Sequence, residues 1–244
     1  MGYECLLAGL PDLKAGAPSP VSSDELNTLL EESLKPSDLP LLNQLRMTPE
    51  SDTISALYTC YQAPDTNDMD KPVWWDDAAS VLSEADLRAA LLYDLGQKSK
   101  NRFVREWYAF NQDMNNVLVA SICRKHGFDV RKAIVGHNEV ADILRTHTQQ
   151  KDFGLGGVMD NLQDILDLAA IDNLMEREKR TDALRFAWLE DKTRFYVFSI
   201  ELVLAYYLEA GMLQRWSALT VEQGEQVFRA MVADMKKGVQ LVNE

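Results

Sequence analysis

All eight prolines of this 244-residue chain lie within its first 72 residues. Proline interrupts a helix interior because it lacks a backbone N–H and its ring clashes with the preceding turn. The stretch from residue 73 to residue 244 is therefore free to form long helices. We expect a proline-rich helical region over residues 1–72 and a main helical bundle over residues 73–244, either as two regions or as one continuous domain.

Helix signals dominate this sequence, and strand signals are nearly absent. Apolar residues from Phe103 onward recur at helical spacing, and Gly127 follows a cationic last turn, which predicts one helix of about six turns. A second long helix is expected over residues 182–210, ended by Gly211 and apolar on nearly every side in its second half. Only residues 4–8 could form a short strand. The predicted fold class is all-α, a multi-helix bundle.

The two long helices are expected to form the central pair of that bundle, with their apolar stripes buried against each other. Residues 105–110 and 193–198 also resemble one another weakly, which is compatible either with related, duplicated helical units or with chance. The stripe residues expected in the core are Phe103, Trp107, Phe110, Met114, Val117, Trp188, Phe195, Phe198, Leu202 and Ala205.

Charge and length exclude two classes of partner. The chain carries 38 acidic and 25 basic residues, a net charge of -13, and nucleic acids are held chiefly by Lys and Arg. We therefore expect no nucleic-acid partner. The longest nearly apolar segment, residues 195–208, is too short for a bilayer span of ~20 residues, so no direct membrane insertion is expected. Three widely spaced cysteines without a CxxC pair indicate a reducing cytoplasm.

The usual sequence signatures of catalysis and metal binding are missing. Neither G-x-S-x-G, nor a phosphate-binding glycine motif, nor an E-x-x-H pair occurs in the sequence. Cys123 lies one helical turn before His126, and this pair is better explained by core packing and helix capping than by an activated thiol. We expect no catalytic, cofactor-binding or metal-binding residue and no enzyme. The remaining alternative is an enzyme whose dispersed site leaves no sequence motif.

Two sets of residues remain as candidates for other roles. Trp74 and Trp75 are adjacent indoles that cannot both face one core from a regular helix. Either one of them is exposed for a partner, or both rings fold back as a lid on the bundle. Glu201 is the one acid inside an apolar run, and a buried carboxylate needs a partner. Arg105 and Arg185 are the candidate cations, and the alternative is that Glu201 reaches solvent.

Several separated segments, in this order, resemble a known family. In combination they are similar to a bacterial family of uncharacterised proteins, typical of Bacteroidetes-like genomes, that is encoded among the subunits of V-type (A/V-type) ATP synthases. The segments cover nearly the whole chain: Tyr3–Asp12, Phe103–Trp107, Asn115–Leu118, Val135–Val140, Ile171–Leu174, Glu176–Glu178 and Arg215–Trp216.

This resemblance implies a function. The family occupies the operon position of the central-stalk subunit, called C in prokaryotes and d in eukaryotes, which is an all-helical socket between the membrane rotor ring and the rotor shaft. The resemblance therefore implies a non-catalytic stalk subunit on the cytoplasmic face of the inner membrane. Such a subunit contacts other V-type ATPase subunits and supports proton or sodium ion transport. Here Gly9, Pro11 and Asp12 replace the basic amino-terminal helix of the socket subunit. The alternative function is a soluble helical adaptor that binds another cytoplasmic protein.

Overall fold

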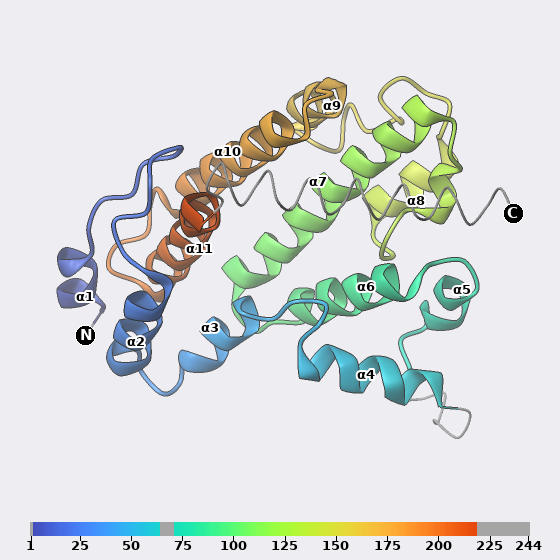
Figure 1. Cartoon of the computed structure of the whole chain (residues 1–244). Coiled ribbons are helices and arrows are strands. Elements are labelled where there is room, and N and C mark those ends of the chain that lie inside the picture. Colours follow the sequence, from blue (N-terminus) through green and yellow to red (C-terminus); the bar gives the residue numbers. More distant parts are fainter. Residues whose placement is uncertain (1, 64–70, 219–244) are drawn as a thin grey trace, which may run out of the picture. The chain divides into compact units, whose positions relative to one another are not determined.

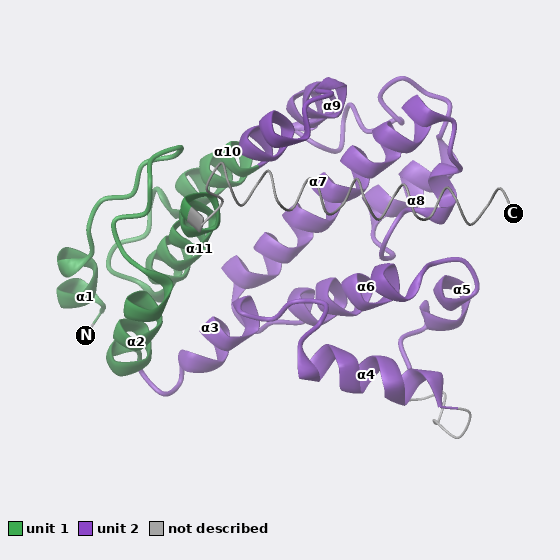
Figure 2. Cartoon of the chain, viewed as in Figure 1, with its two compact units in different colours: residues 1–34, 182–244 green, residues 35–181 purple. Residues whose placement is uncertain are grey.

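The computed structural model describes residues 2–63 and 71–218, and within these ranges every regular element is a helix (Figure 1). The all-α prediction is confirmed. Contacts divide the chain into two compact units: unit 1 comprises residues 1–34 and 182–244, and unit 2 comprises residues 35–181 (Figure 2). The division expected at residue 72 is not the boundary between these units, because residues 1–34 belong to unit 1 and residue 72 lies inside unit 2.

Unit 2 is organised around its longest helix, α7. This helix packs against α6, η1, α8 and α9, and α4 packs in turn on α6. The elements of unit 2 are α3 (Leu39–Leu45), α4 (Asp52–Gln62), α5 (Trp75–Ala79), α6 (Glu84–Gln97), α7 (Arg102–His126), the short 3-10 helix η1 (Val130–Lys132), α8 (Glu139–Thr146), α9 (Leu162–Ala170) and the first turns of α10 (Leu174–Thr193).

Local sequence signals explain both ends of α7. Asn101 caps its first turn by accepting a hydrogen bond of 3.2 Å from the backbone N–H of Val104. Gly127 ends it in the left-handed conformation, with φ 74°, after three basic residues. The helix predicted from Phe103 is therefore confirmed. Four of its five predicted stripe residues are buried, whereas Trp107 is only half-buried.

The approach of α6 to α7 depends on a glycine. A Cβ atom at Gly96 would collide with the ring of Tyr108, so only glycine allows the two helices to come this close. The hydroxyl of Tyr108 then donates a hydrogen bond of 2.6 Å to the carbonyl of Gln44, and the Gln44 side chain donates one of 3.1 Å to the carbonyl of Leu95. These bonds connect α3, α6 and α7.

In unit 1 an amino-terminal segment runs alongside α11. Unit 1 contains α1 (Glu4–Gly9), α2 (Ser23–Ser33), the second part of α10 and α11 (Ile200–Ala218). Tyr206 donates a side-chain hydrogen bond of 3.0 Å to the carbonyl of Pro11, and Gln214, two turns further on, donates one of 3.0 Å to the carbonyl of Val21. The prolines of this segment disfavour a helix, and two of its carbonyls accept hydrogen bonds from α11 instead.

Two predictions for unit 1 are wrong. The single helix expected over residues 182–210 is interrupted, because α10 ends at Thr193 and α11 begins at Ile200. Phe198 adopts a left-handed backbone conformation, with φ 49°, and its carbonyl accepts a hydrogen bond of 2.8 Å from the N–H of Tyr3, which fixes the break. Gly211 does not end a helix but lies inside α11.

The break also exposes side chains that were expected in the core. Phe195 and Phe198 are 90% and 43% exposed, so their predicted burial is wrong. Residues 105–110 lie inside α7, whereas residues 194–198 lie in the connector after α10, so the two similar segments do not share a local structure. Residues 4–8, the one strand candidate, are part of helix α1. The expected central pairing involves elements of both units and stays a prediction.

Candidate functional site

The two adjacent tryptophans occupy different environments in unit 2. Trp75 is 2% exposed and meets the rings of Tyr58 and Tyr61 edge-on, with centroids 5.9 and 5.2 Å away. Trp74 is half-buried and stacks on the ring of His137 at 5.8 Å, with 18° between the planes. Neighbouring helical residues point about 100° apart, which explains why one indole enters the core and the other does not.

Trp74 and His137 form one wall of a small cavity, which we name the Trp74 pocket. Its volume is about 130 Å³. Residues from α6, α7 and the segment before α8 complete its lining, so the pocket brings together side chains that are far apart in the sequence. The lining residues are Trp74, Ala90, Asp94, Gln97, Lys98, Gln112, Gly136, His137 and Asn138.

Two buried amides behind this pocket fix the segment that leads into α8. Gln112 and Asn116 are each 3% exposed, and each donates a hydrogen bond to the carbonyl of Val135, at 2.9 and 2.7 Å. The N–H of Val135 returns a hydrogen bond of 3.0 Å to the Asn116 side chain. Gly136 has φ 83°, and a Cβ atom there would collide with the amide of Gln112. Glycine is therefore required after Val135.

Two carboxylates lie at the Trp74 pocket or beside it. Asp94 is part of the lining and pairs at 2.6 Å with Lys98, which directly follows α6. Asp113 accepts a hydrogen bond of 2.6 Å from Asn138, and burial raises the pKa of Asp113 to about 6 against the opposing effect of that bond. Among the described residues, no cation pairs with Asp113.

Arg145 supports the same segment from α8. Its guanidinium donates to the carbonyls of Ile134 and Gly136 at 3.0 and 2.6 Å. Burial, followed by the charge of Arg145, lowers the pKa of His137, so the imidazole that stacks on Trp74 favours its neutral form. The charged side chains of the pocket wall itself are therefore Asp94 and Lys98.

A second polar cluster lies in unit 1, around a buried acid that was not predicted. Asp182 is 4% exposed and accepts hydrogen bonds from Arg185 at 2.8 Å, from Trp216 at 2.8 Å and from Arg215. The sequence pointed instead to Glu201, which is half-buried. No sequence signal marked Asp182, because it stands in a charged stretch of mixed sign that is typical of a solvated helix face.

The cations proposed as partners of Glu201 have other contacts. Arg185 pairs with Asp182, as described above. Arg105 donates to the carbonyls of Ser99 and Lys100 at 2.7 and 2.9 Å, just before α7 begins. An ion pair between Glu201 and Arg105 or Arg185 stays a prediction.

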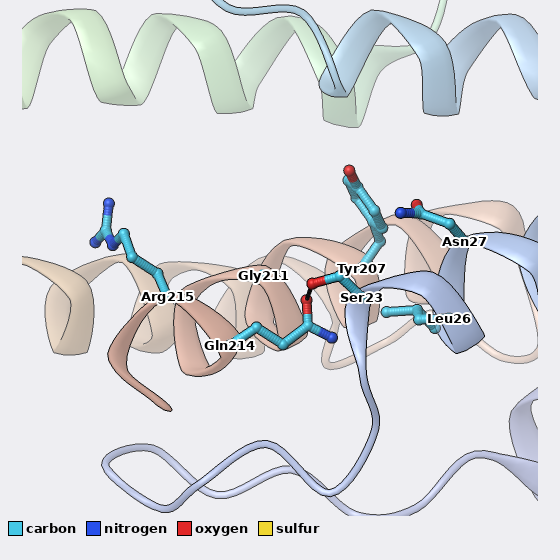
Figure 3. Close-up of a pocket in the computed structure, with 7 residues that line it drawn as sticks. All are labelled: Ser23, Leu26, Asn27, Tyr207, Gly211, Gln214 and Arg215. Carbon is cyan, nitrogen blue, oxygen red and sulfur yellow. Dashed lines mark hydrogen bonds between the residues drawn. The ribbon is translucent and has the colours of Figure 1, made fainter. Parts of the chain in front are cut away.

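An open groove of about 400 Å³ separates parts of α2 and α11 in unit 1 (Figure 3). Ser23 donates a hydrogen bond of 2.7 Å to Gln214 at this groove. The side chains of Tyr207 and Arg215 both extend from α11 (Figure 3). Gly211 leaves open space where a side chain would stand. The other lining residues are Leu26 and Asn27.

None of these three sites resembles a metal centre or an activated nucleophile. Within residues 2–63 and 71–218, no group of three or more His, Cys, Asp or Glu side chains could hold a metal ion. Burial, followed by the charge of Asp129, raises the pKa of the Cys123 thiol, which is the opposite of what a reactive thiolate needs. The same ranges contain no helix with the length and low charge required to cross a bilayer.

Comparison with known proteins gives one family. The family described as "Protein of unknown function (DUF2764)" matches residues 73–239, which is more than half of the chain. The chain belongs to this family. No curated protein and no solved structure gives a significant match. The DUF2764 match contains all the residues of the Trp74 pocket and of the Asp182 cluster, whereas the α2 side of the groove precedes it.

Proposed function

We propose that this DUF2764 protein is a non-catalytic subunit of a V-type rotary ATPase, located on the cytoplasmic face of the membrane. In this role it links the rotor shaft to the membrane ring by protein contacts and so supports proton or sodium ion transport. The choice of partners rests on the resemblance of seven separated segments to a family encoded among V-type ATP synthase subunits. Two of those segments, Asn115–Leu118 and Val135–Val140, contribute Asn116 and Val135, which bind each other in the structure.

The observation that carries a protein-binding role is the connector between α10 and α11. Its four consecutive apolar residues are all exposed, and Phe195 and Val197 reach 90% and 75%. A continuous apolar surface of this kind is a common feature of protein interfaces. The hydrogen bond from Tyr3 to Phe198 holds this connector in place, so a partner would meet an ordered surface.

The chemistry of the described polar groups agrees with a binding role. Three side chains donate hydrogen bonds to backbone carbonyls and so stabilise the segment before α8: Gln112, Asn116 and Arg145. Such contacts build a rigid surface rather than a reacting centre. The alternative function, an adaptor for another cytoplasmic protein, would use the same connector.

A pull-down of the tagged full-length chain from gently solubilised native membranes tests the proposal. We expect V-type ATPase subunits to co-purify with it, and we expect Phe195→Ser with Val197→Ser to abolish their retention. The matched control is Phe128→Ser, which changes an aromatic residue of unit 2 that is 67% exposed and should leave retention unchanged. Circular dichroism checks that each variant folds. Recovery of a complex without ATPase subunits would favour the adaptor.

A further inference from the structure

The acids at the Trp74 pocket are only partly balanced by cations, because the guanidinium of Arg145, whose charge acts on His137, binds the backbone carbonyls of Ile134 and Gly136 instead. Asp94 forms part of its wall, and Asp113 stands directly behind Asn138 without a cationic partner in the described chain. Lys98 is the one cation of the wall, but its side chain is 64% exposed and its ion pair with Asp94 is of the exposed i,i+4 kind, which contributes little. A partly buried carboxylate region of this kind favours a positively charged guest.

The size of the pocket favours a small guest. Its volume of about 130 Å³ has room for about four water molecules at ~30 Å³ each, which is well below the range of drug-sized ligand sites. The stacked rings of Trp74 and His137 form one wall, so a guest would meet an outer face of this stacked pair. A guanidinium is planar and stacks on aromatic faces, whereas an ammonium is a compact and strongly hydrated point charge.

The polar groups of the wall suit a guanidinium as well. The side-chain amide nitrogen of Gln97 donates to Gln112, and the Gln97 oxygen accepts no hydrogen bond within the described chain. Asp94 retains a second carboxylate oxygen beyond the one that binds Lys98. Asp94 and Gln97 lie about one helical turn apart on α6, so their two acceptor oxygens can receive N–H groups from one planar donor.

We propose that the Trp74 pocket receives an arginine side chain presented by a partner protein, with its guanidinium stacked on Trp74 and hydrogen-bonded to Asp94 and Gln97. This inference rests on the proposed function as a partner-binding subunit and adds the chemistry by which one partner is recognised. The buried amide of Gln112 and the left-handed Gly136 hold the rear of the pocket in place before binding, so little reorganisation is required.

Titration of the full-length chain with N-acetyl-arginine methylamide tests the assignment. Binding is followed through the indole N–H signal of Trp74 in NMR spectra, identified with Trp74→Phe. We expect saturable binding in the millimolar range, as for one isolated side chain. N-acetyl-citrulline methylamide has nearly the same shape without the charge and should bind at least about tenfold more weakly, because charge-assisted hydrogen bonds are lost. The lysine analogue should also bind more weakly.

Two variants on α6 separate a specific role of Asp94 from a general effect of charge. Asp94→Asn should weaken arginine binding about tenfold. Glu84→Gln removes an acid of the same helix that forms the same kind of i,i+4 ion pair, with Arg88, outside the pocket, and should leave binding unchanged. Equal binding of the arginine and citrulline probes, equal effects of the two variants, or no saturable shift at Trp74 would overturn the assignment.

The outcomes of this titration and of the pull-down are distinguishable. Retention of the chain with ATPase subunits, combined with no binding of the arginine probe, refutes the pocket assignment alone. Binding of the probe combined with loss of ATPase subunits refutes the proposed partners alone.

Discussion

The indole N–H of Trp216 donates a hydrogen bond of 2.8 Å to the carboxylate of Asp182, and this bond joins α11 to α10 within unit 1. Asp182 is 4% exposed, and a buried carboxylate is tolerated only when its oxygens are well satisfied. Arg185 and Arg215 supply the compensating charge. The cluster therefore stabilises the contact between the two helices on either side of the exposed connector.

Asp182→Asn should destabilise the protein, because it removes the charge that compensates Arg185, whose side chain is 15% exposed. We expect a loss of about 2 kcal/mol in the free energy of unfolding, at the low end for a buried pair because Arg215 is half exposed. Urea denaturation monitored by circular dichroism measures it. The matched control, Asp191→Asn, breaks an exposed pair with Arg194 and should cost less than about 0.5 kcal/mol. Equal losses in both variants would contradict a special role of Asp182.

Glu209 should make the stability of unit 1 depend on pH. Burial, followed by the charge of Glu190, raises the pKa of Glu209 from 4.5 to about 7. An acid with a raised pKa in the folded state stabilises the fold when it is protonated, and this contribution is lost as the pH rises from about 4.5 through about 7.

Glu209→Gln should remove this loss. We expect the variant to exceed the wild type in free energy of unfolding by about 2 kcal/mol at high pH and to match it at low pH. Urea denaturation across this pH range measures the difference in the free energy of unfolding between the two proteins. Asp113, which also has a raised pKa, is present in both proteins, so its contribution cancels in this difference. Glu32→Gln, at an exposed position of α2, is the control and should follow the wild type at every pH. A constant offset between Glu209→Gln and the wild type would refute the assignment.

Local signals allowed much of the fold to be predicted. The extent of α7 followed from the periodicity after Phe103 and from Gly127, because a glycine after a basic last turn is a signal contained in neighbouring residues. The break after Thr193 could not be predicted in this way. Residues 194–199 contain no glycine or proline, and the hydrogen bond that fixes the break comes from Tyr3, almost 200 residues away in the sequence.

The candidate sites were harder to predict for the same physical reason. Helix geometry indicated that Trp74 and Trp75 cannot share one face, but it did not indicate which of the two is buried. The stacking of Trp74 on His137, in contrast, depends on the packing of α5 against the segment before α8. The buried position of Asp182 likewise depends on Trp216, in another helix. Contacts between distant residues cannot be inferred from the pattern of one sequence.

Two glycines inside helices should respond to alanine in opposite directions. At Gly96 a Cβ atom would collide with the ring of Tyr108, so Gly96→Ala should cost about 1–3 kcal/mol through overpacking. At Gly211 no atom lies within 4 Å of the added carbon, so Gly211→Ala should stabilise α11 by up to about 1 kcal/mol through helix propensity. Thermal and urea unfolding of both variants measure the difference. Stabilisation by Gly96→Ala would contradict the close approach of α6 to α7.

The two buried amides behind the Trp74 pocket should differ in importance, although both bind Val135. Asn116 satisfies the N–H and the carbonyl of Val135, whereas Gln112 supplies only a second donor to that carbonyl. Asn116→Leu therefore leaves a buried backbone N–H without an acceptor and should cost about 2–3 kcal/mol. Gln112→Met keeps the volume of the side chain, leaves the carbonyl bonded to Asn116, and should cost about 1 kcal/mol or less.

Urea denaturation ranks the two variants, and backbone hydrogen exchange at Val135 should accelerate strongly in Asn116→Leu alone. A greater loss in Gln112→Met would show that Gln112, through its bond to Gln97, is the main support of this segment.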